Sequence, residues 1–227
     1  MSRYQDRRHA GRVLAAALQK YAGRRDVVVL AVPRGGVPVA YEIATRLGVP
    51  LDVFVVRKLG LPGHEELAMG AIASGGVLVL NRSVVDQLEI SEATLRRVTA
   101  KEQAELARRE QMYRQGRPPL DVTGKTCILV DDGLATGSTM RAAIAALRQR
   151  GAREIVVAVP IAAPSTCEEL ESVADEVVCA ATPEPFHAVG LWYADFEQTT
   201  DEEVRELLEA AAREQAAREQ GDAPQAP

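Results

Sequence analysis

Residues 128–139 carry the side chains with the clearest chemical use, and they read ILVDDGLATGST. An apolar run ends in two adjacent acids, Asp131 and Asp132, and a glycine-bearing loop then leads to Ser138 and Thr139. Glycine lets backbone N–H groups approach a phosphate, and a helix that begins at Ser138 adds unpaired N–H groups and the positive end of its dipole. Two neighbouring carboxylates can accept hydrogen bonds from a vicinal diol and attract Mg²⁺, which prefers oxygen ligands. The stretch therefore predicts a site for a phosphorylated sugar.

Alternating strand and helix patterns surround this stretch. Apolar runs predict strands, and 3.6-residue periodicity or capping signals predict helices between them. This alternation is typical of an α/β fold with a doubly wound, mainly parallel sheet flanked by helices. Ligands of such sheets bind beyond the carboxyl ends of the strands. The expected strands are 27–32, 51–56, 126–130, 155–159 and 177–180, and the expected helices are 4–21, 38–47, 91–115, 139–150, 165–173 and one from about 200.

Two further loops are expected at the same edge of the sheet as Asp131. The turn Pro33-Arg34-Gly35-Gly36 follows the first strand, and Arg57-Lys58 follows the second. Each segment alone would be read as an ordinary turn or a solvated strand end. The segment 59–70 contains three glycines and a proline and predicts a mobile loop, and residues 71–74 and 77–80 predict a hairpin.

The bulk composition limits the classes of function. The net charge of −5 argues against nonspecific nucleic-acid binding. The sequence contains no apolar run long enough to span a membrane, so it gives no indication of a membrane protein. The three separated cysteines suggest no disulfide framework, so we expect a cytoplasmic protein. We expect one domain over residues 1–209 and a disordered tail over 210–227.

ILVDDGLATGST closely resembles the motif with which type I phosphoribosyltransferases bind 5-phosphoribosyl 1-pyrophosphate (PRPP). The resemblance extends over about residues 27–196. More narrowly, the chain resembles stand-alone bacterial proteins with this domain. The resemblance implies the type I phosphoribosyltransferase fold with a small hood subdomain, here residues 180–200. It also identifies residues 83–118 as a long helical insertion.

The resemblance implies a role for each matching residue. Asp131 and Asp132 would bind the ribose hydroxyls and Mg²⁺, and residues 135–139 the 5-phosphate. Arg34, Gly35 and Gly36 would form the pyrophosphate loop, and Lys58, with Arg57, would stand where the second strand leads into the mobile catalytic loop. Arg34, Lys58, Asp131 and Asp132 would be catalytic. The full set of PRPP-binding residues would be Arg34, Gly35, Gly36, Arg57, Lys58, Asp131, Asp132, Gly133, Leu134, Ala135, Thr136, Gly137, Ser138 and Thr139.

The acceptor base would lie under the hood. The densest aromatic cluster of the chain, residues 185–196, is loosely similar to the hood of purine-salvage members. Under that similarity Phe186 would stack on the base and Asp195 would lie near Mg²⁺, with His187, Trp192 and Tyr193 as further contacts. The opposite interpretation is that these rings seal a small core of their own. Ala135 stands where hypoxanthine- and guanine-type members carry an acid, so that position offers no general acid or base.

The resemblance implies an Mg²⁺-dependent phosphoribosyltransferase, a pentosyltransferase of EC class 2.4.2. It would transfer ribose 5-phosphate from PRPP to a small nitrogenous base and release pyrophosphate. Such proteins often form homodimers. A noncatalytic sensor of PRPP or a nucleotide, and a hydrolase of phosphosugars, remain alternatives. The sequence leaves open the acceptor and the role of Glu65 and Glu66.

Overall fold

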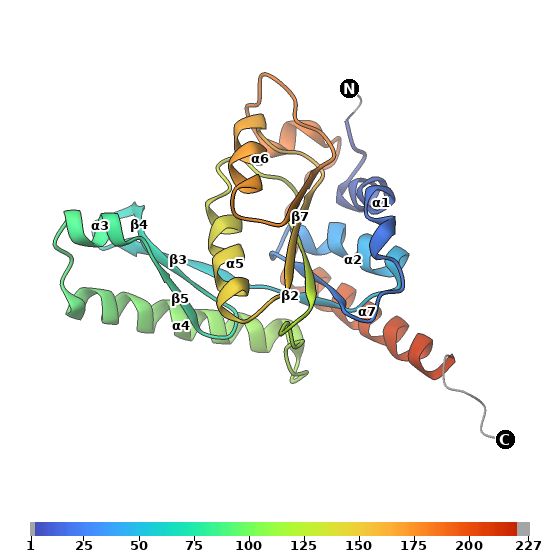
Figure 1. The fold of residues 1–227 in the computed structure, drawn as a ribbon, viewed down its shortest axis with the longest axis horizontal. Coiled ribbons are helices and arrows are strands. Elements are labelled where there is room, and N and C mark those ends of the chain that lie inside the picture. Colours follow the sequence, from blue (N-terminus) through green and yellow to red (C-terminus); the bar gives the residue numbers. More distant parts are fainter. Residues whose placement is uncertain (1–2, 222–227) are drawn as a thin grey trace.

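A computed structural model describes residues 3–221, and its centre is a parallel sheet of five strands in the order β2-β1-β6-β7-β8 (Figure 1). The α/β fold with a mainly parallel sheet is therefore confirmed. Its strands are β1 (Val27–Ala31), β2 (Leu51–Val53), β6 (Thr126–Val130), β7 (Glu154–Val159) and β8 (Glu176–Cys179).

Helices cover both faces of this sheet because its strands are apolar on both sides. Alternate residues of β1, such as Val27 and Val29, pack into one core with α1 (Arg7–Ala17), α2 (Gly36–Leu47) and α7 (Asp201–Gly221). The intervening residues, such as Val28 and Leu30, pack into a second core with α5 (Ser138–Gln149) and α6 (Pro164–Glu171). Short 3₁₀ turns, η1 (Gln19–Tyr21) and η2 (Val189–Trp192), complete this part.

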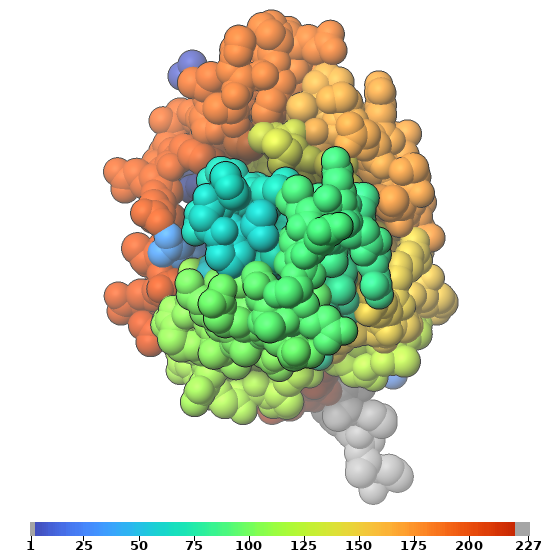
Figure 2. Space-filling model, turned by 90° about the vertical axis from the view of Figure 1, so that its left-hand side faces the viewer, coloured from blue at the N-terminus to red at the C-terminus, as the bar shows by residue number. Residues whose placement is uncertain are grey.

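A second, antiparallel sheet, which we call the flap, projects to one side of the first (Figures 1 and 2). It consists of β3 (Val56–Leu61), β4 (His64–Ala73) and β5 (Val77–Leu80), followed by α3 (Arg82–Gln87) and α4 (Glu92–Arg114). The prediction of a mobile loop over 59–70 is therefore wrong, since these residues form paired strands joined by a tight turn at Pro62-Gly63. Leu59 and Met69 are fully buried, so core packing outweighs the local glycine and proline signals.

Two other expectations need correction. Cys167 of α6 and Cys179 of β8 form a disulfide, with Cα atoms 6.8 Å apart, and only Cys127 among the three cysteines is free. The expected disordered tail is helical up to Gly221, and the rest of it lies outside the described residues. None of the helices in residues 3–221 combines the length and apolar character needed to cross a membrane.

Candidate active site

The acid pair follows the fully buried strand β6 at its carboxyl end. The backbone N–H of Asp132 donates to Oδ1 of Asp131 at 2.8 Å. Burial raises the pKa of the Asp131 carboxyl well above its ordinary value, and the adjacent Asp132 charge raises it further. Burial also raises the pKa of Asp132, while hydrogen bonding to Arg7 opposes the rise. Such a pair gains most from a ligand that brings a cation or O–H donors.

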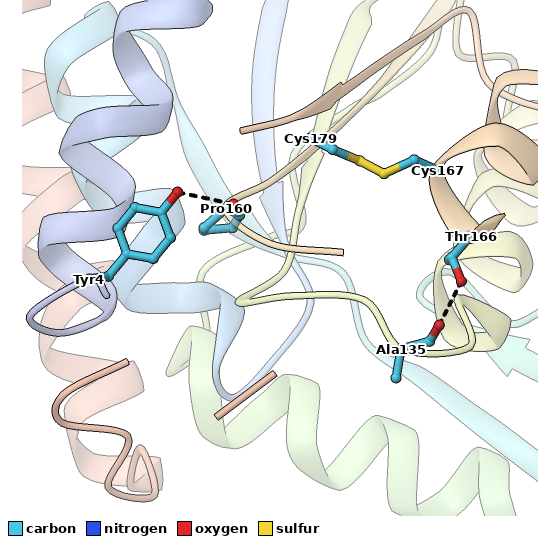
Figure 3. The surroundings of a disulfide bond; sticks show 6 residues. All are labelled: Tyr4, Ala135, Pro160, Thr166, Cys167 and Cys179. Carbon is cyan, nitrogen blue, oxygen red and sulfur yellow. Dashed lines mark hydrogen bonds between the residues drawn. A yellow bond between two sulfur atoms is a disulfide. The ribbon is translucent and has the colours of Figure 1, made fainter. Parts of the chain in front are cut away.

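Residues 133–139, here called the phosphate loop, connect the acids to α5. The loop is anchored on both sides: Leu134 donates its N–H to the carbonyl of Ile161 at 2.9 Å, and the Thr166 hydroxyl donates to the carbonyl of Ala135 at 2.6 Å (Figure 3). Gly137 has a φ of +65° and caps α5, so it turns the chain where a side chain would be strained. Ala135, Thr136, Ser138 and Thr139 are exposed. The first N–H groups of α5 and three hydroxyls therefore lie together at an open position, an arrangement of donors that suits an anion.

The Pro33–Gly36 turn packs directly against the acid pair. The Pro33–Arg34 peptide bond is cis. A Cβ on Gly35 would lie 2.6 Å from Cγ of Asp132, and one on Gly36 would lie 2.7 Å from the Val130 carbonyl oxygen. Real side chains do not approach so closely, so glycine is required here for contact between the two loops. Arg34 is half-buried, with its guanidinium 3.9 Å from a carboxylate oxygen of Asp201.

The two cations at the base of the flap differ in their surroundings. Arg57 donates twice to Oε2 of Glu102 on α4, at 2.6 and 2.9 Å, so its charge is neutralised inside the fold. Lys58 is exposed and donates to the Glu66 carbonyl at 2.7 Å, with the Glu66 carboxylate 3.7 Å away. Of the two cations, Lys58 is thus the one more accessible to a ligand, and Glu66 is its partner. Glu65 is exposed, and one of its carboxylate oxygens accepts the N–H of Gly63 at the flap tip.

A cavity of about 400 Å³ lies between the flap and the beginning of α5. Lys58, Ser138 and Thr139 line it together, so residues from two predicted loops meet there. Arg141, another lining residue, is held by Glu169 and by the Thr136 carbonyl. The remaining wall comes mainly from small and apolar residues of the flap.

The aromatic residues of the hood segment (residues 180–200) form a small core with the N-terminal segment. Tyr193 is buried, so its predicted contact with a base is not supported by its position; its hydroxyl donates to the Asp132 carbonyl at 2.6 Å. Phe186 and Trp192 are half-buried against the same cluster, whereas His187 is exposed. Asp195 is exposed, and one carboxylate oxygen accepts the N–H of Glu197.

Arg7 reaches the acid pair and was missed by the sequence reasoning. Its Nε donates to Oδ2 of Asp132 at 2.8 Å. No motif marks it, because it lies 125 residues before its partner and the helix that carries it has no local sign of function. The only available signal was the basic composition of the first helix.

Comparison with known proteins identifies the family. The family model described as "Phosphoribosyl transferase domain" matches residues 2–69 and 61–191. The chain belongs to this family.

Relatives agree with this assignment. A Mycobacterium tuberculosis protein provisionally named phosphoribosyl transferase Rv0571c is 47% identical over 214 residues, which are 94% of this chain and 48% of that protein. The chain thus spans about half the length of the curated relatives it matches first. A crystal structure of the protein TT1426 from Thermus thermophilus superposes with a TM-score of 0.80 at 46% identity, covering 91% of this chain and 97% of that one. A Lactobacillus delbrueckii protein named uracil phosphoribosyltransferase is 47% identical over 58 residues, 26% of each chain.

Proposed function

We propose that this phosphoribosyltransferase-family protein transfers ribose 5-phosphate from PRPP to a nitrogenous base and releases pyrophosphate. The observation that carries the proposal is the close contact between the Pro33–Gly36 turn and the acid pair, beside the phosphate loop. Ribose hydroxyls, 5-phosphate and pyrophosphate would then each meet a suitable group within one crevice.

The proposed reaction is a displacement at the anomeric carbon of ribose. Pyrophosphate leaves, and a ring nitrogen of the base attacks through an oxocarbenium-like state. Negative charge grows on the departing pyrophosphate, so preorganised cations aid the reaction most. Arg34 and Lys58 would take that role after their ion pairs with Asp201 and Glu66 break. The flap and the hood segment would exclude water, which otherwise hydrolyses the activated sugar.

The residues present fit a Mg²⁺ that takes most of its ligands from the substrate. Among the described residues no group of three or more His, Cys, Asp or Glu side chains could hold a metal alone. Asp131 and Asp132 offer two carboxylates, and Mg²⁺ in such sites is commonly held by one or two carboxylates plus substrate phosphates and water. When bound, it would neutralise pyrophosphate oxygens. A part for Asp195 in this site stays a prediction.

The acceptor is proposed to lie between the phosphate loop and the hood segment, with Phe186, Trp192 and His187 as candidate contacts. A homodimer and residues 1–209 as one domain remain parts of the proposal. So does a cytoplasmic location, although the Cys167–Cys179 disulfide removes one of its supports.

The test is release of pyrophosphate from PRPP and Mg²⁺ across a panel of bases that includes uracil, adenine and hypoxanthine. We expect turnover with at least one base and its loss in Asp131→Asn with Asp132→Asn. PRPP binding without product from any base would instead support the sensor alternative. Release of ribose 5-phosphate without a base would support the hydrolase alternative. Light scattering of the purified protein tests the dimer.

A further inference from the structure

Arg7 is fixed by three contacts at the beginning of α1. Besides the Nε contact with Asp132, its Nη1 donates to the Glu197 carbonyl at 2.6 Å. Its guanidinium carbon lies 3.9 Å from the centre of the Phe196 ring. Only 12% of the Arg7 side chain and 16% of the Asp132 side chain are exposed, so this pair is largely shielded from water and salt.

These contacts belong to a closed ring of four residues, one of which is the second acid, Asp132. Arg7 holds the Asp132 carboxylate, and the Tyr193 hydroxyl holds the Asp132 carbonyl. Tyr193 stacks on Phe196 with centroids 4.9 Å apart, and Phe196 stacks under Arg7. Side chain and backbone of Asp132 are therefore both fixed by groups outside its own loop.

The N-terminal segment is itself attached to the hood segment. Tyr4 donates its N–H to the Trp192 carbonyl at 2.9 Å, and Ala194 donates to the Tyr4 carbonyl at 2.8 Å. The Tyr4 hydroxyl donates to the carbonyl of Pro160, just after β7 (Figure 3). Arg7 follows three residues later, at the start of α1, so its position depends on the hood segment as well as on α1.

The Pro33–Gly36 turn packs against the same carboxylate oxygen of Asp132 that Arg7 binds: a Cβ on Gly35 would overlap Oδ2 and lie 3.3 Å from the Arg7 Nε. Arg7 and Gly35 together therefore restrict the orientation of the Asp132 carboxylate. Asp131 contrasts with it, because its contact with the Asp132 N–H is made within the same loop.

We propose that Arg7 is a positioning residue of the donor site, which acts through Asp132 and joins the acid pair to the hood segment. The inference rests on the proposed function, since it takes PRPP as the ligand of the acid pair. Arg7 orients the Asp132 carboxylate toward the ribose hydroxyls before PRPP arrives. Binding of the donor and the position of the hood segment are thereby coupled through one guanidinium.

The experiment measures PRPP affinity in the presence of Mg²⁺ by calorimetry for wild type, Arg7→Gln, Arg7→Lys and the control Arg8→Gln. Arg8 lies one residue further along the same helix, is about half exposed, and pairs with Glu42. We expect Arg7→Gln to weaken PRPP binding about 10- to 100-fold, as for other groups that orient a ligand-binding carboxylate. Arg8→Gln should stay within about twofold, since Arg8 pairs with Glu42 and not with the acid pair, and Arg12 remains 3.5 Å from Glu42. Arg7→Lys keeps the charge without the fork that reaches two acceptors, so its affinity should lie between wild type and Arg7→Gln.

A double-mutant cycle separates positioning from a general structural role. If Arg7 acts through Asp132, adding Arg7→Gln to Asp132→Asn should weaken binding by less than about twofold. Full additivity of the two changes, or equal affinities for Arg7→Gln and Arg8→Gln, would overturn the inference. If Arg7→Gln does not fold by circular dichroism, Arg7→Lys enters the same cycle. A folded wild-type protein that does not bind PRPP would overturn the proposed function and this inference together, whereas wild-type binding with an unaffected Arg7→Gln overturns the inference alone.

Discussion

A Cβ atom on Gly35 would lie 2.6 Å from Cγ of Asp132, although these residues belong to loops that follow different strands. Gly35 itself has φ −59° and ψ −30°, a conformation that alanine adopts freely. The cost of a side chain here therefore comes from its contacts with the Asp132 carboxylate and with the Arg7 Nε, which would lie 3.3 Å from the Cβ. The two loops can form one site only if this position carries no side chain.

Gly35→Ala should therefore displace the acid pair. We expect PRPP affinity to fall at least about tenfold and unfolding free energy to fall by about 1–3 kcal/mol, the usual effect of overpacking. Calorimetry with PRPP and urea unfolding measure the two quantities. Gly23→Ala is the control, because a Cβ there meets nothing within 4 Å and only the positive φ of 68° is strained. Unchanged PRPP affinity in Gly35→Ala would contradict the assignment of the turn to the donor site.

The sequence predicted local structure best where the residues concerned are neighbours in the chain. The run from Ile128 to Thr139 contains its own strand, acids, glycine turn and helix start, so the order of its residues predicts its local structure. The placement of the Pro33–Gly36 turn followed from the rule that parallel strands end at one edge. Both inferences needed no knowledge of tertiary packing.

The sequence failed where distant contacts decide the structure. Arg7 meets Asp132 across 125 residues, and Cys167 meets Cys179 only because α6 packs beside β8. The flap strands contain glycine and are joined by a Pro62-Gly63 turn, and they are ordered by burial of Leu59 and Met69 in the hydrophobic core. The local secondary-structure propensity of a segment predicts none of these contacts.

Arg57 and Lys58 should respond differently to loss of charge. Lys58→Gln removes the exposed cation from the cavity beside Ser138 and should lower kcat by about 100-fold, as for loss of one group that stabilises developing charge. Arg57→Gln should mainly lower the unfolding free energy, by about 1–2 kcal/mol, because Glu102 is left partly buried without its partner. Steady-state kinetics and urea unfolding of both variants distinguish the roles. Adding Glu102→Gln to Arg57→Gln should recover part of the stability, and a failure to do so would contradict the pairing.

Thr166→Val should loosen the phosphate loop. The substitution keeps the shape of the side chain but removes the donor to the Ala135 carbonyl, which costs about 1 kcal/mol of unfolding free energy for a typical hydrogen bond. PRPP affinity should weaken in parallel, because Ala135 lies in the loop assigned to the 5-phosphate. Ser172→Ala is the matched control, since its hydroxyl also donates to a carbonyl but at an exposed position. Equal effects of both variants on PRPP affinity would argue against this support of the loop.

The Cys167–Cys179 disulfide can be tested by counting free thiols. With three cysteines in the chain, unreduced protein unfolded in guanidinium should show one reactive thiol, from Cys127, and reduced protein should show three. Reduction should lower the unfolding free energy by about 3 kcal/mol, the value that loop closure predicts for a loop this short. A Cys167→Ala/Cys179→Ala variant should be insensitive to reductant. Three thiols in the unreduced protein would show that the pair is not oxidised under those conditions.

Alkaline pH should destabilise the protein through its tyrosines. Burial, followed by hydrogen bonding to Asp201, raises the pKa of Tyr113 from an ordinary value near 10 to about 12. The pKa values of the other four tyrosines are also raised, mainly by burial for three of them and by a hydrogen bond to Glu214 for Tyr41.

Because the tyrosine pKa is higher in the folded state, unfolding releases protons once the pH exceeds the tyrosine pKa of the unfolded chain. The stabilisation is therefore complete below about pH 10 and is lost as the pH rises toward 12. Absorbance at 295 nm should show native tyrosines ionising later than those of the chain in guanidinium. Tyr113→Phe should reduce the loss of stability between pH 10 and 12. Native and unfolded titration curves that coincide would contradict the buried, hydrogen-bonded placement of these side chains.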